Sequence, residues 1–162
     1  MRGPDAVGLI DRCLRLFEEA RSSGRAVTVS ELAGRFPRAR GRGAERGRRF
    51  HLSRVLSLDP YAAAYEERWA CPLPLAWRFR WGWLYGVADQ VVFERGVPVA
   101  VVEVKSYPGA RKAERVQASL YGLLVMLVFA VRPRVYLYHS RLEEVPEWEA
   151  VALEALRGFP RA

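Results

Sequence analysis

The stretch GVADQVVFERGVPVAVVEVKSY, residues 86–107, predicts two antiparallel strands joined by a turn at residues 95–98. Apolar residues dominate both predicted strands, and the second is typical of a strand buried on both faces. Asp89, Glu103 and Lys105 interrupt this apolar pattern. Burying such charges is costly unless they are paired or bind a metal ion. The three side chains therefore need a functional or structural explanation.

Glu103 and Lys105 lie on one face of their predicted strand, because successive strand residues point to opposite faces. The preceding strand carries Asp89 across a hairpin short enough to bring the two carboxylates together. Two such carboxylates form an oxygen-rich site that suits Mg²⁺ or Mn²⁺ together with a phosphate group and water. Beside this metal, the Lys105 ammonium would orient the attacking water or neutralise charge on the phosphate. A purely structural Glu103–Lys105 ion pair is the alternative.

The rest of the chain alternates segments of helical and strand periodicity. Helices are predicted over residues 5–20, 44–58, 111–131 and 147–157, and a further helix is predicted to be capped by Ser30. Strands are expected over residues 78–93, 99–107 and 134–140, with residues 61–77 as a connector that holds a short strand or helix. This order predicts an α/β (α+β) fold in which helices flank a mixed central sheet. We expect one compact domain, with a helical N-terminal segment over residues 1–43 and the core over residues 44–162.

The chain carries a formal net charge of +8, and its lysines are Lys105 and Lys112, so arginine supplies nearly all of the positive charge. Guanidinium groups suit phosphate oxygens, which points to a polyanionic partner, with a codon bias toward arginine as the alternative. Residues 35–49 hold seven arginines among glycines: Arg35, Arg38, Arg40, Arg42, Arg46, Arg48 and Arg49. We interpret this segment either as a solvated loop or as an arm that follows a phosphate backbone.

Cys13 and Cys71 lie far apart and form no CxxC motif, so we expect two small buried apolar residues. The first residues lack the apolar segment of a signal peptide, which favours a cytoplasmic location. The longest uncharged run, residues 116–131, is shorter than the ~20 residues that span a bilayer, and is interpreted as a core helix. Five aromatic residues are expected mainly in the core, with base stacking as the alternative: Trp69, Trp77, Trp81, Trp83 and Tyr85.

Three motifs carry a family resemblance. Asp89 followed by Glu103-Val104-Lys105 resembles the D…(D/E)xK signature of the PD-(D/E)XK nuclease superfamily. In QASLY, residues 117–121, Gln117 and Tyr121 lie one helical turn apart, which is similar to the QxxxY motif of the RecB-like branch. Upstream, ERGRRFH, residues 45–51, resembles the first motif of that branch, a helix whose histidine joins the metal site. These motifs stand in family order and cover about half of the chain.

The resemblance implies a restriction-endonuclease-like core and a metal-dependent deoxyribonuclease. Such an enzyme would hydrolyse phosphodiester bonds of DNA as an exonuclease on single-stranded or end-bearing DNA. The resemblance also implies that one or two Mg²⁺ or Mn²⁺ ions are held by His51, Asp89, Glu103 and the backbone carbonyl of Val104. Lys105 would position the nucleophile. Gln117 and Tyr121 would brace the site or contact DNA, with simple packing as the alternative.

The small size most resembles the CRISPR-associated RecB-like exonucleases. Those proteins commonly hold an iron–sulfur cluster on four cysteines, and this chain has two, so we expect no cluster. Two other hypotheses stay open: a catalytically inactive nucleic-acid-binding module on the nuclease fold, and a Holliday-junction-type endonuclease whose first-motif glutamate would be Glu45. No membrane partner is expected, and both a monomer and a homodimer remain open.

Overall fold

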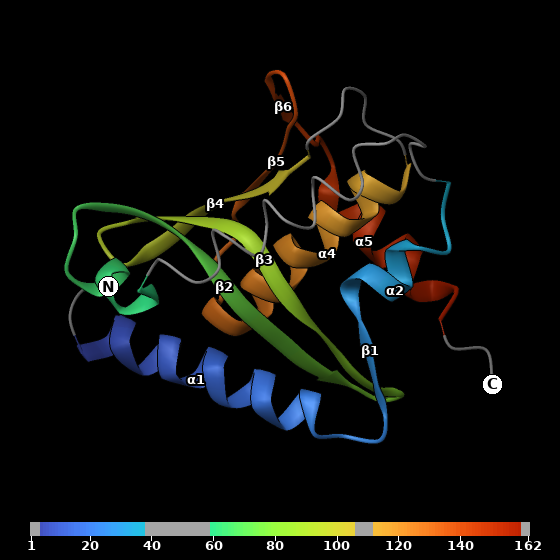
Figure 1. Cartoon of the computed structure of the whole chain (residues 1–162), viewed down its shortest axis with the longest axis horizontal. Helices are drawn as coiled ribbons and strands as arrows, with labels where there is room; N and C mark the ends of the chain where they lie inside the picture. The colour runs from blue at the N-terminus through green and yellow to red at the C-terminus, as the bar shows by residue number, and fades with distance from the viewer. Residues whose placement is uncertain (1–3, 38–58, 106–111, 160–162) are drawn as a thin grey trace.

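A mixed six-stranded sheet forms the centre of the computed structural model, which describes residues 4–37, 59–105 and 112–159 (Figure 1). The long strand β3 (Gly82–Glu94) pairs with the antiparallel β2 (Arg68–Phe79) along its whole length. The short β1 (Ala26–Thr28) pairs in parallel with the start of β3, and β4 (Val97–Val104) pairs antiparallel with its end. The predicted mixed sheet is therefore confirmed.

The sheet continues beyond β4 with β5 (Arg134–Tyr138), which is parallel to β4, and β6 (Leu142–Glu144), which is antiparallel to β5. The strand predicted over residues 134–140 is confirmed, whereas the short β6 was not predicted. Three residues of β6 alternate exposed and half-buried, which gives too short a pattern to recognise in a sequence.

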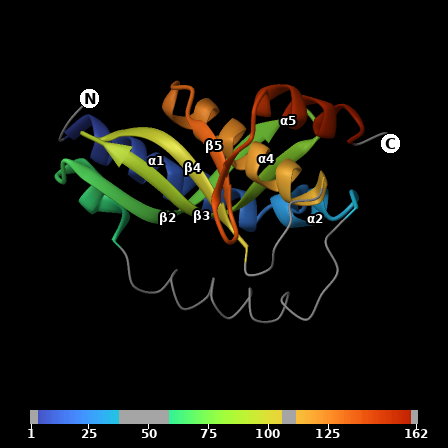
Figure 2. The same cartoon turned by 90° about the horizontal axis from the view of Figure 1, so that it is seen from above.

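Helices pack on this sheet as expected. The helix α1 (Pro4–Arg21) packs along β2 and β3, and α4 (Lys112–Phe129) packs across β2, β3, β4 and β5. The helix α5 (Trp148–Arg157) lies beside α4, as Figure 2 shows. Residues 116–128 of α4 are largely buried, so its interpretation as a core helix is confirmed. Within the described residues, no helix is long and apolar enough to cross a membrane.

The short helix α2 (Val29–Ala33) begins two residues earlier than a cap at Ser30 would allow. Its N-cap is Thr28, whose hydroxyl accepts a 3.1 Å hydrogen bond from the Glu31 backbone N–H. The Glu31 carboxylate in turn accepts a 2.7 Å hydrogen bond from the Thr28 backbone N–H. This reciprocal capping box satisfies two backbone donors, whereas Ser30 already lies inside the helix. The prediction of Ser30 as the cap was therefore wrong.

The prediction of a connector over residues 61–77 was wrong for most of that segment. A short 3₁₀ helix, η1 (Pro60–Ala64), precedes the twelve-residue strand β2. The prolines at 72 and 74 suggested a broken segment, because proline cannot donate to a sheet ladder. Among the described strands β2 pairs with β3 alone, so it is an edge strand of the kind that tolerates proline.

The prediction of one strand over residues 78–93 was also wrong. Phe79 pairs with Gly82, so the chain reverses at Arg80 and Trp81 and the segment is divided between β2 and β3. The second turn is shorter than predicted: Glu94 pairs with Val97 across residues 95 and 96. Both turn residues have positive φ, 52° and 77°, which matches the right-handed twist of a two-residue hairpin. The helix predicted over residues 44–58 lies outside the described residues.

Candidate functional site

A β-bulge in β3 brings Asp89 onto the same side of the sheet as Glu103. Cys71 of β2 pairs with Val91, but Leu73 pairs with Ala88, so Asp89 and Gln90 together lie opposite a single residue, Pro72. The extra residue changes which face the following side chains occupy, a common device beside functional sites. On the other edge Gln90 pairs with Val102, and this register, continued by one residue, sets Asp89 opposite Glu103.

The Asp89 carboxylate connects the middle of β3 to the end of β4. Its Oδ2 accepts a 2.8 Å hydrogen bond from the backbone N–H of Val104, the last residue of β4. The Asp89 carboxylate also lies close enough to Glu103 to raise the pKa of that side chain. Two acidic groups that approach this closely share a proton or attract a cation, because two carboxylates side by side repel each other.

Glu103 is almost completely buried, with an exposed fraction of 1%. Its Oε1 lies 3.2 Å from Lys105 Nζ, and its Oε2 has no hydrogen-bond partner within the described part of the chain. Burial raises the pKa of Glu103 well above its ordinary value, the Asp89 carboxylate raises this pKa further, and Lys105 opposes both effects. A buried acidic oxygen without a protein partner is a plain candidate for a cation ligand.

Lys105 connects the sheet to α4. Its Nζ donates to Gln117 Oε1 at 3.0 Å in addition to its contact with Glu103. Its backbone N–H donates to the Tyr138 carbonyl at 2.7 Å, which fixes the end of β4 against β5. The side chain keeps an exposed fraction of 13%, so the ammonium is shielded but is not sealed from solvent.

Tyr121 is buried beside the two carboxylates, with an exposed fraction of 3%. Its pKa is raised well above the ordinary value by burial first and then by Glu103 and Asp89, while a hydrogen bond with Gln117 lowers it. The phenol is therefore neutral at physiological pH. Such burial suits bracing of the site better than contact with DNA, the other role expected of this residue.

Glu114 is a buried polar residue of α4 that the sequence analysis did not identify. It lies in the first turn of α4 and has an exposed fraction of 2%. Its spacing of three residues from Gln117 places both side chains on one helix face, and that spacing was the signal available in the sequence.

Part of the predicted site lies outside the described residues. This holds for His51, for the alternative Glu45, and for six of the seven arginines: Arg38, Arg40, Arg42, Arg46, Arg48 and Arg49. Over residues 4–37, 59–105 and 112–159, no group of three or more His, Cys, Asp or Glu side chains is arranged to hold a metal ion. The described site therefore consists of two carboxylates, one ammonium, one amide and one phenol.

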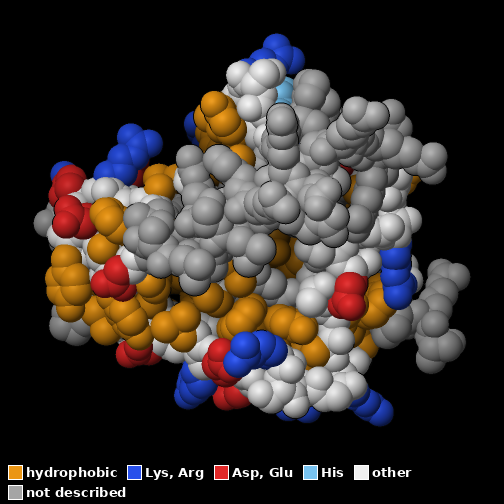
Figure 3. Space-filling view, viewed as in Figure 1, with side chains coloured by type: hydrophobic (Ala, Val, Ile, Leu, Met, Phe, Trp, Pro, Cys, Tyr) orange, Lys and Arg blue, Asp and Glu red, His pale blue; other side chains and the backbone are white. Residues whose placement is uncertain are grey.

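Among the seven arginines of residues 35–49, Arg35 lies within the described part of the chain. The Arg35 guanidinium stacks over the Phe159 ring, 4.3 Å from its centroid. Elsewhere, exposed arginines form ion pairs such as Arg21 with Glu18. Figure 3 shows Lys and Arg side chains spread along the edges of one face, with acidic side chains near several of them.

The aromatic residues and the cysteines belong mainly to the core, as expected. Trp69, Trp77 and Trp81 are half-buried against the main core, while Trp83 is buried and Tyr85 packs beside it. Cys13 and Cys71 are completely buried free thiols. Burial raises the pKa of each thiol to about 12, so neither is a reactive thiolate at neutral pH.

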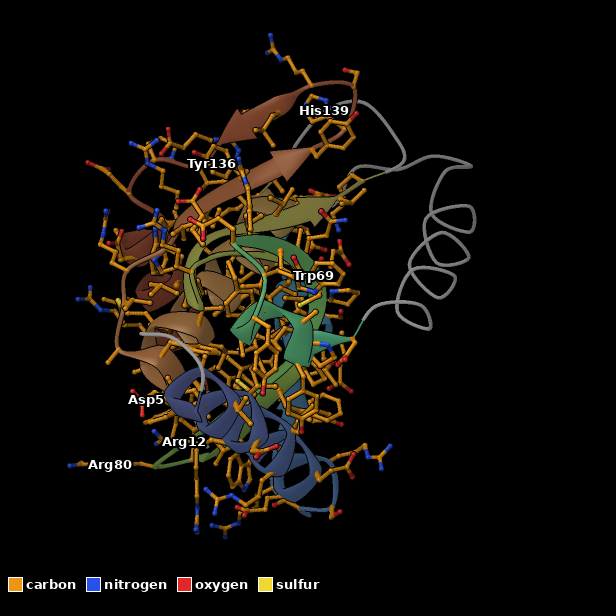
Figure 4. All side chains as sticks on the ribbon, turned by 90° about the vertical axis from the view of Figure 1, so that its left-hand side faces the viewer. Asp5, Arg12, Trp69, Arg80, Tyr136 and His139 are labelled. Atoms are coloured by element: carbon orange, nitrogen blue, oxygen red, sulfur yellow. The ribbon has the colours of Figure 1, made fainter. Side chains whose placement is uncertain are left out.

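A second polar cluster, which sequence reasoning missed, holds the β5–β6 hairpin against α4. The Glu143 carboxylate lies 3.2 Å from His139 Nε2 and 2.9 Å from an Arg115 guanidinium nitrogen. Figure 4 shows His139 at the end of this hairpin. A hydrogen bond from His139 is the largest cause that lowers the pKa of Glu143. The HSRLEE sequence, with His139 four residues before Glu143, was the available signal.

Comparison of the chain with known protein-family models, with curated proteins and with solved structures gives no match. The interpretation of the site therefore depends on its own chemistry and on the motifs in the sequence.

Proposed function

We propose that the chain is a divalent-metal-dependent deoxyribonuclease with a restriction-endonuclease-like core, related to the RecB-like branch of the PD-(D/E)XK superfamily. One observation carries this proposal: the Asp89 carboxylate in the middle of β3 meets the Glu103 carboxylate near the end of the adjacent β4, with Lys105 Nζ beside Glu103. An ion pair that served only stability would need one carboxylate for one ammonium. Here the half-buried Asp89 carboxylate lies close to the buried Glu103 carboxylate, although their mutual repulsion is unfavourable.

The donor set fits Mg²⁺ or Mn²⁺. Both ions prefer oxygen ligands, and the buried Glu103 Oε2 lacks a hydrogen-bond partner in the described part of the chain. Asp89 and Glu103 would hold the ion, with the Val104 carbonyl and His51 as further proposed ligands. When bound, the ion would lower the pKa of a bound water and polarise the scissile phosphodiester.

The other side chains of the site would orient the reacting groups. Lys105 Nζ, held by Glu103 Oε1 and Gln117 Oε1, would position the attacking water and offset negative charge that develops on the phosphate. Asp89 would keep the end of β4 in place through the Val104 N–H. The arginines of residues 35–49 would supply phosphate contacts that do not depend on sequence. The substrate that we propose is DNA, single-stranded or bearing ends, and exonuclease action is the form that the motifs favour.

Cleavage of end-labelled DNA tests this proposal. Purified protein is incubated with single-stranded, double-stranded and flapped DNA, with Mn²⁺ or Mg²⁺ and with EDTA. We expect cleavage that requires metal and that Glu103→Gln and Lys105→Ala abolish while circular dichroism shows an intact fold. Glu94→Gln and Lys112→Ala are matched controls, because both residues are exposed and lie outside the proposed site.

Two outcomes would contradict nuclease activity. The first is absence of metal-dependent cleavage on all three substrates, and the second is full activity in Glu103→Gln. DNA binding that falls with salt but does not respond to metal or to Asp89→Ala would instead identify a catalytically inactive binding module.

A further inference from the structure

Gly86 lies in β3 where this strand passes beneath α4, and a side chain would not fit there. A Cβ at Gly86 would lie 2.6 Å from the Tyr121 hydroxyl oxygen, and 3.1 Å and 3.2 Å from the ring atoms Cε1 and Cζ. The backbone does not require glycine at this position, because the positive-φ glycines among the described residues are Gly82 and Gly96. Glycine is therefore needed at this position because a larger residue would collide with the Tyr121 phenol, which packs against the Gly86 backbone.

The Tyr121 phenol interacts with Gln117, the side chain that holds the candidate catalytic lysine. Gln117 uses its carbonyl oxygen, Oε1, to accept from Lys105 Nζ at 3.0 Å. On α4, Tyr121 lies four residues after Gln117, so the phenol and the amide share one helix face. An amide has one acceptor end and one donor end, so with Oε1 at Lys105 the NH₂ group of Gln117 is left for the Tyr121 phenol.

We propose that Gly86 is a positioning residue of the candidate site: its lack of a side chain admits the Tyr121 hydroxyl, which orients the Gln117 amide that holds Lys105. This inference rests on the proposed function only for its catalytic consequence. The arrangement of the four residues can be tested without activity.

Gly122, the residue after Tyr121, supplies a matched control. A Cβ there would lie 2.6 Å from Val135 Cγ2 and 3.1 Å from Trp148 Cε3, which is as tight as at Gly86. Its neighbours are apolar core atoms, however, and not a hydrogen-bonded side chain. Gly122→Ala therefore reproduces the crowding without touching the polar connection.

The first test uses the side-chain amide signals in a ¹⁵N–¹H NMR spectrum. The chain has two glutamines, Gln90 and Gln117, and no asparagine, so two NH₂ pairs are expected, and Gln117→Glu assigns them. We expect Gly86→Ala and Tyr121→Phe to shift the NH₂ signals of Gln117 and to speed the exchange of these protons with solvent. The NH₂ signals of Gln90 and the spectrum of Gly122→Ala serve as references. A Gln117 pair unchanged in both Gly86→Ala and Tyr121→Phe would overturn the proposal.

The second test is a double-mutant cycle on the rate of DNA cleavage. We expect Gly86→Ala to lower kcat by about 100-fold with little change in KM, because a small misplacement of a reacting group has this effect. The Gly86→Ala/Tyr121→Phe double variant should cleave little more slowly than Tyr121→Phe alone, because the closest contact, 2.6 Å to the hydroxyl oxygen, is gone and the ring contacts at 3.1 Å and 3.2 Å need only a small shift. Additive losses would overturn the positioning role. If the wild type cleaves no DNA, the NMR result still decides the arrangement, so the two proposals fail separately.

Discussion

The Asp89 carboxylate accepts a 2.8 Å hydrogen bond from the backbone N–H of Val104, so a charged side chain in the middle of β3 closes the end of β4. The negative charge of the same carboxylate raises the pKa of Glu103. Asp89 therefore has a hydrogen bond to Val104 and an electrostatic interaction with Glu103, and different substitutions can remove one without the other.

Asp89→Asn should keep the structural contact and lose the charge. An amide oxygen still accepts from the Val104 N–H, and repulsion with Glu103 is removed, so we expect stability equal to or above that of the wild type and loss of metal-dependent cleavage. Asp89→Ala removes the acceptor, and we expect the free energy of unfolding to fall by about 1–3 kcal/mol. Urea unfolding with EDTA present measures both effects. Equal destabilisation by the two substitutions would show that the hydrogen bond to Val104 contributes nothing.

Glu103→Gln should change how stability depends on pH. Because the pKa of Glu103 in the folded state lies above its ordinary value of 4.5, the folded state binds more protons than the unfolded state above that pH. The contribution of Glu103 to stability is therefore complete below pH 4.5 and is lost as pH rises through the folded-state pKa. We expect the glutamine variant to gain stability relative to the wild type between about pH 4 and pH 7. The measurement is urea unfolding without metal at several pH values. A stability difference between Glu103→Gln and the wild type that stays constant over this range would contradict the raised pKa.

Glu143→Gln should change the dependence of stability on pH in the opposite direction to Glu103→Gln. The hydrogen bond from His139 lowers the pKa of Glu143, with a smaller effect from Arg115, so the folded state binds fewer protons than the unfolded state near the ordinary pKa. Its stabilising effect is present above pH 4.5 and is lost as pH falls through the lowered folded-state pKa. The difference in stability between the wild type and Glu143→Gln should therefore shrink as the pH falls below 4.5. A difference that stays constant during acid titration would argue against this contact in solution.

Helices and the charged hairpin could be predicted from the sequence because their signals are local. The apolar spacing in α1 and the long apolar run in α4 each determine a buried face without reference to the rest of the chain. Alternation along β4 likewise places Glu103 and Lys105 on one face, and the structure brings Lys105 to Gln117 across the gap to α4.

Other features depend on neighbours that the sequence does not identify. Pro72 indicates a break in a chain, yet at an edge strand it lies opposite the bulge that turns Asp89 toward Glu103. Gly86 looks like any strand glycine until α4 is placed over it with the Tyr121 hydroxyl in the available space. Thr28 and Ser30 are both suitable caps by composition, and the Glu31 carboxylate decides between them by reaching back to Thr28.

The capping box at Thr28 supports the helix that carries Gln117, and this support can be measured. α2 leads to Pro37, whose carbonyl accepts a 3.0 Å hydrogen bond from the Ala113 N–H at the start of α4. Thr28→Ala removes the acceptor for the Glu31 N–H, and we expect the free energy of unfolding to fall by about 1 kcal/mol. Thr28→Ser keeps the hydroxyl and should retain most of this stability. Thermal or urea unfolding of the two variants compares them directly, and an equal loss in both would mean that the methyl group of Thr28, rather than its hydroxyl, stabilises this region.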